Sequence, residues 1–112
     1  MSHEPSIKAG RLAAGMSFNQ KVWALTSRVP AGKVTTYAAI ARKLKTKAYR
    51  AVGQALNRNP YAPQVPCHRV VGSAGALTGF ATGLAKKAAM LRREGVAVRN
   101  GRVDVKKFAA AV

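Results

Sequence analysis

Residues 35–58 read TTYAAIARKLKTKAYRAVGQALNR, and this stretch decides the fold class. Thr35 or Thr36 can cap a helix, because a hydroxyl group there accepts a backbone hydrogen bond in the first turn. Two runs then place apolar residues at helical spacing, with a short basic link between them. The inward positions are Tyr37, Ile40, Ala41 and Leu44 in the first run, and Ala51, Val52, Ala55 and Leu56 in the second. Two short helices joined by a tight turn predict a helix-turn-helix motif.

The second helix of the pair, about residues 48–58, is the predicted DNA-reading element. Arg50 near its start is expected to contact phosphates, because most protein–DNA hydrogen bonds go to the backbone. Gly53 lies in the helix interior, where glycine costs about 1 kcal/mol relative to alanine. That cost indicates a close approach by either another helix or a DNA strand, and the sequence alone does not choose between them.

The charge of the chain points to a polyanion as partner. Twenty Lys and Arg residues stand against three Asp and Glu, a formal net charge of +17 over 112 residues. A self-contained metabolic enzyme rarely carries such an excess. Lys43, Lys45 and Lys47 form either a solvated face or a set of phosphate contacts, and the net charge favours the contacts. No stretch approaches the roughly 18 apolar residues of a membrane span, so we expect a cytoplasmic, DNA-associated protein with no membrane contact.

Two more helices are predicted outside the motif from apolar spacing, over about residues 17–29 behind a Ser17 cap and over about 84–94. Valines alternate on both sides of Asn100-Gly101, the pattern of a two-stranded hairpin that would act as a wing. The prediction is therefore a mainly α fold with a small β wing, a winged helix-turn-helix in one domain over residues 17–112.

The first 16 residues mix Ser, Pro and Gly with basic side chains and show no period. We expect residues 1–16 to be a flexible basic segment.

Cys67 is the only cysteine, which excludes an internal disulfide and a zinc cluster built on cysteines. Three prolines within residues 59–66 stiffen the chain that leads to it. The adjacent His68 and the basic surroundings favour a thiolate. If Glu94 reaches the imidazole, the three side chains form a Cys-His-Glu relay.

The alternative is that these residues have only structural roles: a buried cysteine, a histidine paired with the backbone, and a Glu94 that balances the charges of Arg92 and Arg93. The spacing of Cys67, His68 and Glu94 does not choose between the relay and this structural interpretation. From spacing alone, Tyr37 is predicted to be a core residue. No group of His, Cys and acidic residues has metal-ligand spacing, so we expect no metal and no cofactor.

Three stretches occur in order along the chain: Arg50-Ala51-Val52-Gly53-Gln54-Ala55-Leu56, Asn59-Pro60, and Pro66-Cys67-His68-Arg69-Val70. They resemble the C-terminal domain of the O6-alkylguanine-DNA alkyltransferases (methylated-DNA–protein-cysteine methyltransferases). Gly32-Lys33-Val34-Thr35-Thr36-Tyr37 and Leu91-Arg92-Arg93-Glu94-Gly95 add matches in the same order, so the likeness runs from about Phe18 to Gly95.

The resemblance implies a monomer that binds double-stranded DNA containing O6-alkylguanine in the minor groove and rotates the damaged base into a pocket. The alkyl group would pass irreversibly to Cys67, so each molecule acts once. By the same matching, His68 would deprotonate Cys67 through a water and Glu94 would orient His68. Tyr37 would assist the flipped nucleotide and donate a proton to the departing guanine, and Asn59 would brace the turn before the active site.

The remaining implied contacts concern DNA and the base. Arg50 would fill the space that the guanine leaves, with Gly53, Ser73, Tyr37 and Lys47 as further DNA contacts. Val70, Phe80, Ala81 and Pro66 would form the base pocket, with the backbones of Val70 and Ala81 gripping the base edge.

Two departures from the family's pattern matter, the first for the rate of transfer and the second for stability rather than chemistry. Phe80-Ala81 stands where a tyrosine followed by a serine is common, which removes a hydroxyl group that could assist the leaving oxygen, so slower transfer is expected. The resemblance also covers no separate N-terminal domain, where some members carry zinc.

Two alternatives to a transferase remain. One resembles the alkyltransferase-like proteins, which bind the same lesion without transfer and recruit other repair machinery; those typically replace the cysteine. The other is a plain basic winged-helix protein with an idle thiol.

Overall fold

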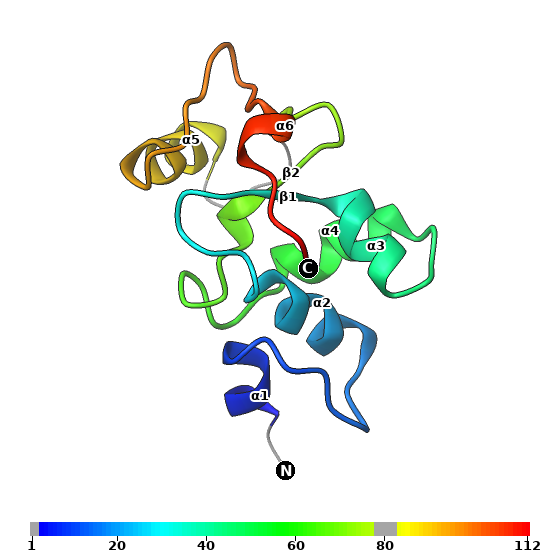
Figure 1. Cartoon of the computed structure of the whole chain (residues 1–112). Helices are drawn as coiled ribbons and strands as arrows, with labels where there is room; N and C mark the ends of the chain where they lie inside the picture. Colours follow the sequence, from blue (N-terminus) through cyan, green and yellow to red (C-terminus); the bar gives the residue numbers. More distant parts are fainter. Residues whose placement is uncertain (1–2, 78–82) are drawn as a thin grey trace.

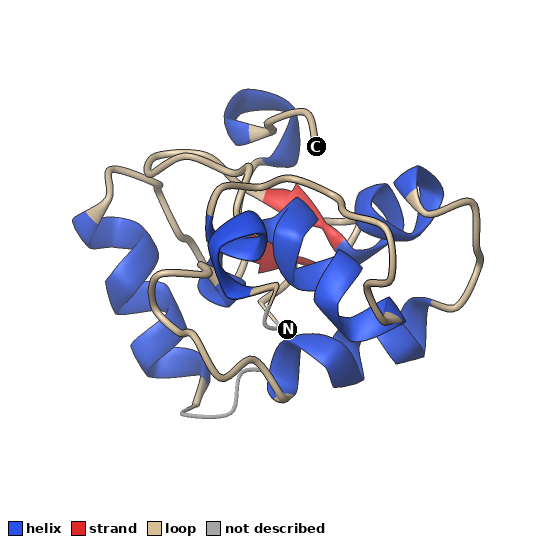
Figure 2. Cartoon of the chain, turned by 90° about the horizontal axis from the view of Figure 1, so that it is seen from below, coloured by secondary structure: helices blue, strands red, loops and turns tan. Residues whose placement is uncertain are grey.

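The computed structural model describes residues 3–77 and 83–112 (Figure 1). The first elements are α1 (Glu4–Lys8), α2 (Phe18–Thr26), β1 (Thr35–Thr36), α3 (Tyr37–Lys43) and α4 (Tyr49–Asn57). They are followed by the 3₁₀ helix η1 (Cys67–Arg69), β2 (Val70–Val71), α5 (Leu84–Arg93) and α6 (Val105–Phe108). Short helices surround two short strands at the centre (Figure 2), so the prediction of a mainly α fold is confirmed.

The helix-turn-helix prediction is also confirmed, as helices α3 and α4. The Thr36 hydroxyl accepts from the Ala39 N–H at 3.0 Å and caps α3. Lys45 in the turn has a φ of 58°, a left-handed conformation that reverses the chain in few residues. Helix α2 packs on the pair, and the Trp23 indole N–H donates to the Ala55 carbonyl of α4 at 2.7 Å. The shared core consists of Val22, Leu25, Ile40, Ala41, Val52, Ala55, Leu56 and Val70.

Helix α2 begins where the sequence predicts. Ser17 and Gln20 form a capping box, in which each side chain accepts from the other residue's backbone N–H. The helix ends at Thr26, before the predicted end at residue 29. Val29 is nevertheless buried, so it belongs to the core without belonging to the helix.

An extended chain was predicted over residues 68–71, of which Val70–Val71 form β2 while His68 and Arg69 belong to η1; strand β1 and the pairing of the two strands were not predicted. Strand β1 pairs with β2 in parallel, with Thr35 opposite Val70 and Thr36 opposite Val71. Strand β1 runs directly into α3, and β2 directly follows η1. The pairing therefore brings residues 67–69 beside the start of the helix-turn-helix, although about 30 residues separate them in the chain. Each strand has only two residues, which is too short for an alternation pattern to be visible in the sequence.

The predicted hairpin forms only at its tip. Asn100 and Gly101 have φ values of 53° and 71°, as a tight hairpin turn requires, and Arg99 and Arg102 exchange two 2.9 Å backbone hydrogen bonds. Arg102 also bridges Ala76 in the loop after β2. The second predicted strand is wrong beyond Val103, because the Asp104 side chain caps α6, which starts at Val105. The wing is thus one turn held against a loop.

The expectation of a flexible segment over residues 1–16 does not fit the described part of it, residues 3–16. Helix α1 lies there, Ile7 is fully buried, and Met16 is 7% exposed. Both pack with Ala24 and Val65. One buried residue in a five-residue helix creates no visible period, so the sequence pattern could not reveal it. Among the described residues, no helix is long and apolar enough to cross a membrane.

Candidate active site and DNA-facing surface

Cys67 begins η1 at the end of the proline-rich loop and is half-buried. Asn59 holds this loop from its start, because its side-chain N–H donates to the Val65 carbonyl at 2.8 Å. The Asn59 side-chain oxygen Oδ1 accepts from the Tyr61 backbone N–H at 2.9 Å. Val65 and Pro66 are buried beneath the turn. A fixed backbone therefore carries a thiol that remains partly open to solvent.

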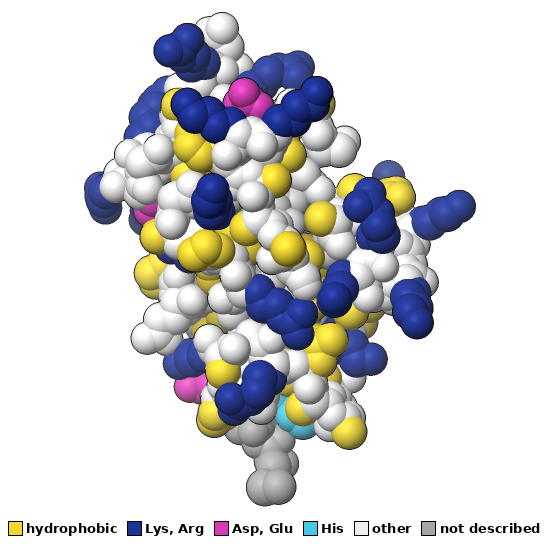
Figure 3. Space-filling view, in the orientation of Figure 1, with side chains coloured by type: hydrophobic (Ala, Val, Ile, Leu, Met, Phe, Trp, Pro, Cys, Tyr) yellow, Lys and Arg dark blue, Asp and Glu magenta, His cyan; other side chains and the backbone are white. Residues whose placement is uncertain are grey.

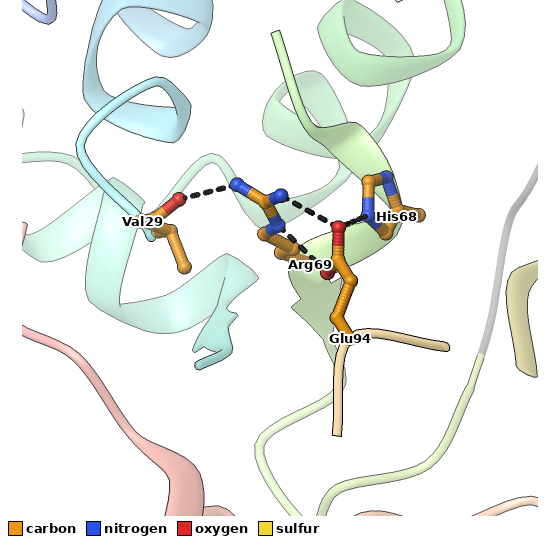
Figure 4. A network of polar contacts seen from close by, with 4 residues as sticks. All are labelled: Val29, His68, Arg69 and Glu94. Carbon is orange, nitrogen blue, oxygen red and sulfur yellow. Dashed lines mark hydrogen bonds and ion pairs between the residues drawn. The ribbon is translucent and has the colours of Figure 1, made fainter. Parts of the chain in front are cut away.

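Glu94 lies between His68 and Arg69, at the end of α5 (Figure 4). Its Oε2 is 3.0 Å from His68 Nε2. The Arg69 guanidinium donates to both carboxylate oxygens, at 2.9 and 2.6 Å, and also to the Val29 carbonyl at 2.8 Å. The predicted contact between Glu94 and His68 is therefore present. Glu94 pairs with Arg69 rather than with Arg92, which donates to the Val98 carbonyl.

The environment of Glu94 keeps it ionised. Partial burial by itself acts to raise the pKa of the Glu94 carboxyl, but the hydrogen bonds from Arg69 and His68, and their charges, outweigh burial. The pKa of Glu94 is therefore lowered. A carboxylate can only accept, so His68 Nε2 must carry the proton that the 3.0 Å contact requires.

His68 is held neutral with its other nitrogen ready to accept a proton. The side chain is 2% exposed, and burial lowers the pKa of His68 more than the Glu94 contact raises it. With the proton on Nε2, Nδ1 carries the lone pair. Nδ1 is buried and has no hydrogen-bond partner among the described residues. A buried hydrogen-bond acceptor without a partner destabilises the folded state. Beside a nucleophile, however, the same lone pair can accept the nucleophile's proton.

Lys87 is a buried cation that the sequence analysis missed. It lies on the inner face of α5, and its ammonium group donates to the Val70 carbonyl at 2.6 Å. Burial lowers the pKa of Lys87 to about 8, while the negative charge of a Cys67 thiolate acts in the opposite direction. The ammonium group is thus coupled electrostatically to the thiol. Lys87 lies one residue before Ala88 and four before Leu91, both buried, so the period of α5 could have flagged it.

Tyr37 opens α3 directly after β1 and is half-buried against the shared core. Its ring centroid lies 5.9 Å from the Lys87 ammonium nitrogen. Tyr37 therefore packs against the core and also lies beside the candidate site. Of the predicted base pocket, Pro66 and Val70 are buried next to Cys67, whereas Phe80 and Ala81 lie outside the described residues.

The predicted DNA contacts lie on the surface of the helix-turn-helix and the loop after β2. Lys47, Arg50 and Ser73 are exposed. A Cβ atom on Gly53 would meet no atom of the described protein within 4 Å, so packing against another helix does not explain this glycine. A hollow of about 400 Å³ is lined by Tyr37, Ala38, Tyr49 and Ser73.

Basic side chains cover much of the face seen in Figure 3, with few acidic ones between them. Within the described residues, no group of three or more His, Cys, Asp and Glu side chains could hold a metal ion.

Comparison with known proteins shows which family the sequence matches. Residues 17–96 match the family described as "6-O-methylguanine DNA methyltransferase, DNA binding domain". The methylated-DNA–protein-cysteine methyltransferase of Methanosarcina mazei is 49% identical over 81 residues, 71% of this chain and 51% of the relative. The chain spans about half the length of the curated relatives it matches.

Solved structures share the fold. S. pombe Atl1 in complex with damaged DNA containing O6-carboxymethylguanine has a TM-score of 0.75 at 28% identity, over 85% of this chain and 95% of Atl1. Mycobacterium tuberculosis OGT in complex with DNA has a TM-score of 0.68 at 37% identity, over 83% of this chain and 62% of that protein.

Proposed function

This chain belongs to the 6-O-methylguanine DNA methyltransferase family, through the family's DNA binding domain, and we propose that it transfers the alkyl group of O6-alkylguanine in DNA to Cys67. The observation that carries the proposal is the neutral, buried His68, fixed by Glu94 and directly adjacent to a partly accessible thiol. A structural cysteine needs no such neighbour. The proposal assigns to this chain the methyltransferase activity for which its relatives are named.

The nucleophile is the Cys67 thiolate. His68 Nδ1 takes the thiol proton, by way of a water because no hydrogen bond among the described residues joins the two side chains directly, and Glu94 stabilises the imidazolium that results. Sulfur then attacks the alkyl carbon, so a sulfur–carbon bond forms while the carbon–O6 bond breaks. The products are S-alkylcysteine and guanine.

The departing guanine takes up negative charge and then a proton. Tyr37, at the edge of the site, is the proposed proton donor. Lys87 is the proposed source of positive charge, because an ammonium group in a buried position interacts more strongly than it would in water. This positive charge would offset the absence of the hydroxyl group that the family commonly has at the positions of Phe80-Ala81.

The proposed substrate is duplex DNA, held by the helix-turn-helix. Lys47 and Ser73 would contact phosphates, and the open side of Gly53 would let a strand approach α4. Arg50 would enter the duplex where the damaged guanine has rotated out. These contacts would deliver the base to Cys67.

Mass spectrometry of the intact protein tests the proposal. After incubation with a duplex that contains one O6-methylguanine, the wild type should gain one methyl group on Cys67, and Cys67→Ser should gain none. An unmodified wild type that still binds the lesion duplex would disprove transfer. That result would promote the second candidate, a lesion-binding protein without transfer, which the similarity to Atl1 bound to damaged DNA favours. The presence of Cys67 favours the first.

A further inference from the structure

Tyr49 is a large aromatic side chain that the fold leaves in solvent. It is 51% exposed, and the other large apolar side chains exposed to a similar degree among the described residues are Leu12 and Leu84. A single exposed apolar residue is ordinary on a protein surface. What distinguishes Tyr49 is its position, because it is the first residue of α4 and the direct neighbour of Arg50.

Two hollows meet at this ring. The first, of about 400 Å³, is lined by Tyr49 together with Tyr37, Ala38 and Ser73. The second, of about 340 Å³, is lined by Tyr49 together with the basic turn of the helix-turn-helix, namely Arg42, Lys45, Thr46 and Lys47. Tyr49 therefore separates the hollow that contains the active-site tyrosine from one that suits phosphates.

The chemistry of these surroundings specifies the partner. Lys45 and Lys47 next to the ring repel another basic surface and attract a polyanion. No side chain caps the first turn of α4, so its N–H groups add positive potential beside the ring. An aromatic ring among cations suits a nucleobase, whose face it covers while the cations hold the phosphates. A protein partner would instead need a larger apolar patch than one side chain.

We propose that Tyr49 stacks on a nucleobase that loses its neighbour when the damaged guanine leaves the duplex, beside the Arg50 side chain that takes the guanine's place. This inference rests on the proposed function, since it requires an opened duplex. It adds a specificity-determining residue, because the ring gains a stacking partner only after opening. An intact duplex offers base edges and sugars, whereas an opened one offers a base face.

The experiment measures DNA affinity in a Cys67→Ser background, so that the lesion persists during titration. Dissociation constants are measured for a duplex with one O6-methylguanine and for the same duplex undamaged. Tyr49→Ala should weaken lesion binding about tenfold, within the range for loss of one aromatic–base stack. It should weaken undamaged-duplex binding less than about twofold. Tyr49→Phe should keep both affinities, because the ring remains.

Leu12→Ala is the matched control, since it removes an exposed apolar side chain, 43% exposed, from the segment between α1 and α2. It should leave both affinities unchanged. Thermal unfolding of each variant checks that the fold is intact.

Two results would overturn the inference. Equal loss on both duplexes in Tyr49→Ala would make the residue a general backbone contact, and a loss in Tyr49→Phe as large as in Tyr49→Ala would assign the effect to the hydroxyl group. Failure of the proposed function looks different, since the parent protein would then fail to prefer the lesion duplex over the undamaged one at all.

Discussion

Lys87 and Lys47 are the same residue type in opposite surroundings. Lys87 lies inside the protein, donates to a backbone carbonyl and has a pKa of about 8, whereas Lys47 is exposed in the basic turn of the helix-turn-helix. The contrast extends to their neighbours. The charged side chains of the site, Arg69 and Glu94, are half-buried and paired with each other, whereas those beside Lys47, namely Arg42 and Lys45, are exposed and both positive.

The difference shows how one small chain divides its charges between two tasks. Burying a charged side chain carries a desolvation penalty, but it also fixes the position of the group and shifts its pKa. The proposed chemistry needs both effects. Exposed charged side chains stay hydrated and therefore carry little penalty. They attract DNA over a long range, and salt screens this attraction. Substitutions in the buried set should therefore change transfer and stability, while substitutions in the exposed set should change affinity and its salt dependence.

The largest effect is expected from Glu94→Gln. The neutral amide can no longer stabilise a His68 imidazolium, and Arg69 loses its anionic partner. Transfer should fall about 100-fold or more, measured as the rate of methyl uptake by Cys67, and urea unfolding should show a loss of about 2 kcal/mol.

Glu4→Gln is the matched control for this change. Glu4 pairs with Lys8 on the surface of α1 at 2.9 Å, and the lost pair should cost less than about 0.5 kcal/mol and leave transfer intact. Equal effects of the two substitutions would contradict the division between buried and exposed charge.

A pH profile gives the next largest effect. Because burial lowers the pKa of His68 below its usual 6.5, the imidazole stays neutral at pH 7, and transfer to a saturating lesion duplex should fall only at a pH below that usual value. Each further unit of acid should slow the rate about tenfold, as the acceptor nitrogen protonates. A decline that begins above pH 7 would show that His68 is not held neutral.

Lys87→Met tests the cost of the buried cation. An unfolded chain holds the lysine proton up to about pH 10.5, and the folded chain releases it near pH 8. The unfolded state therefore binds more protons between these values, and the wild type should gain about 2 kcal/mol of unfolding free energy from pH 7.5 to 9.5.

In the methionine variant this gain should be absent, as urea unfolding at both pH values can determine. Transfer by the variant should also fall at pH 7, because the charge near the leaving group is gone. A pH-dependent gain equal to that of the wild type would place the titration elsewhere.

The smallest effect is expected from Lys47→Ala. Stability should change by less than about 0.5 kcal/mol, and affinity for lesion and undamaged duplexes should fall by the same factor. The slope of log affinity against log salt should decrease in magnitude by about 1, as fluorescence anisotropy over a salt series can measure. Lys21→Ala, at an exposed position of α2, is the control, and its slope should equal that of the wild type.

The sequence by itself determined the local elements and predicted the chemistry of the candidate site. Helical spacing and caps such as Ser17 and Thr36 specified α2, α3 and α4, because these signals lie within a few residues of one another. The adjacency of Cys67 and His68, and the family motif around them, pointed to the nucleophile and its base.

Tertiary structure alone decided what lies next to what. The two-residue pairing of β1 with β2, the burial of Lys87 against the Val70 carbonyl, and the contact of Arg69 with both Glu94 and Val29 join residues that are 17 to 40 positions apart. It also turned Val105 into a helix residue and buried Ile7 in α1. Contacts at such separations depend on how the whole chain packs. The helical period of α5 could indicate that Lys87 faces inward, but no local pattern could identify the Val70 carbonyl, 17 positions away, as its partner.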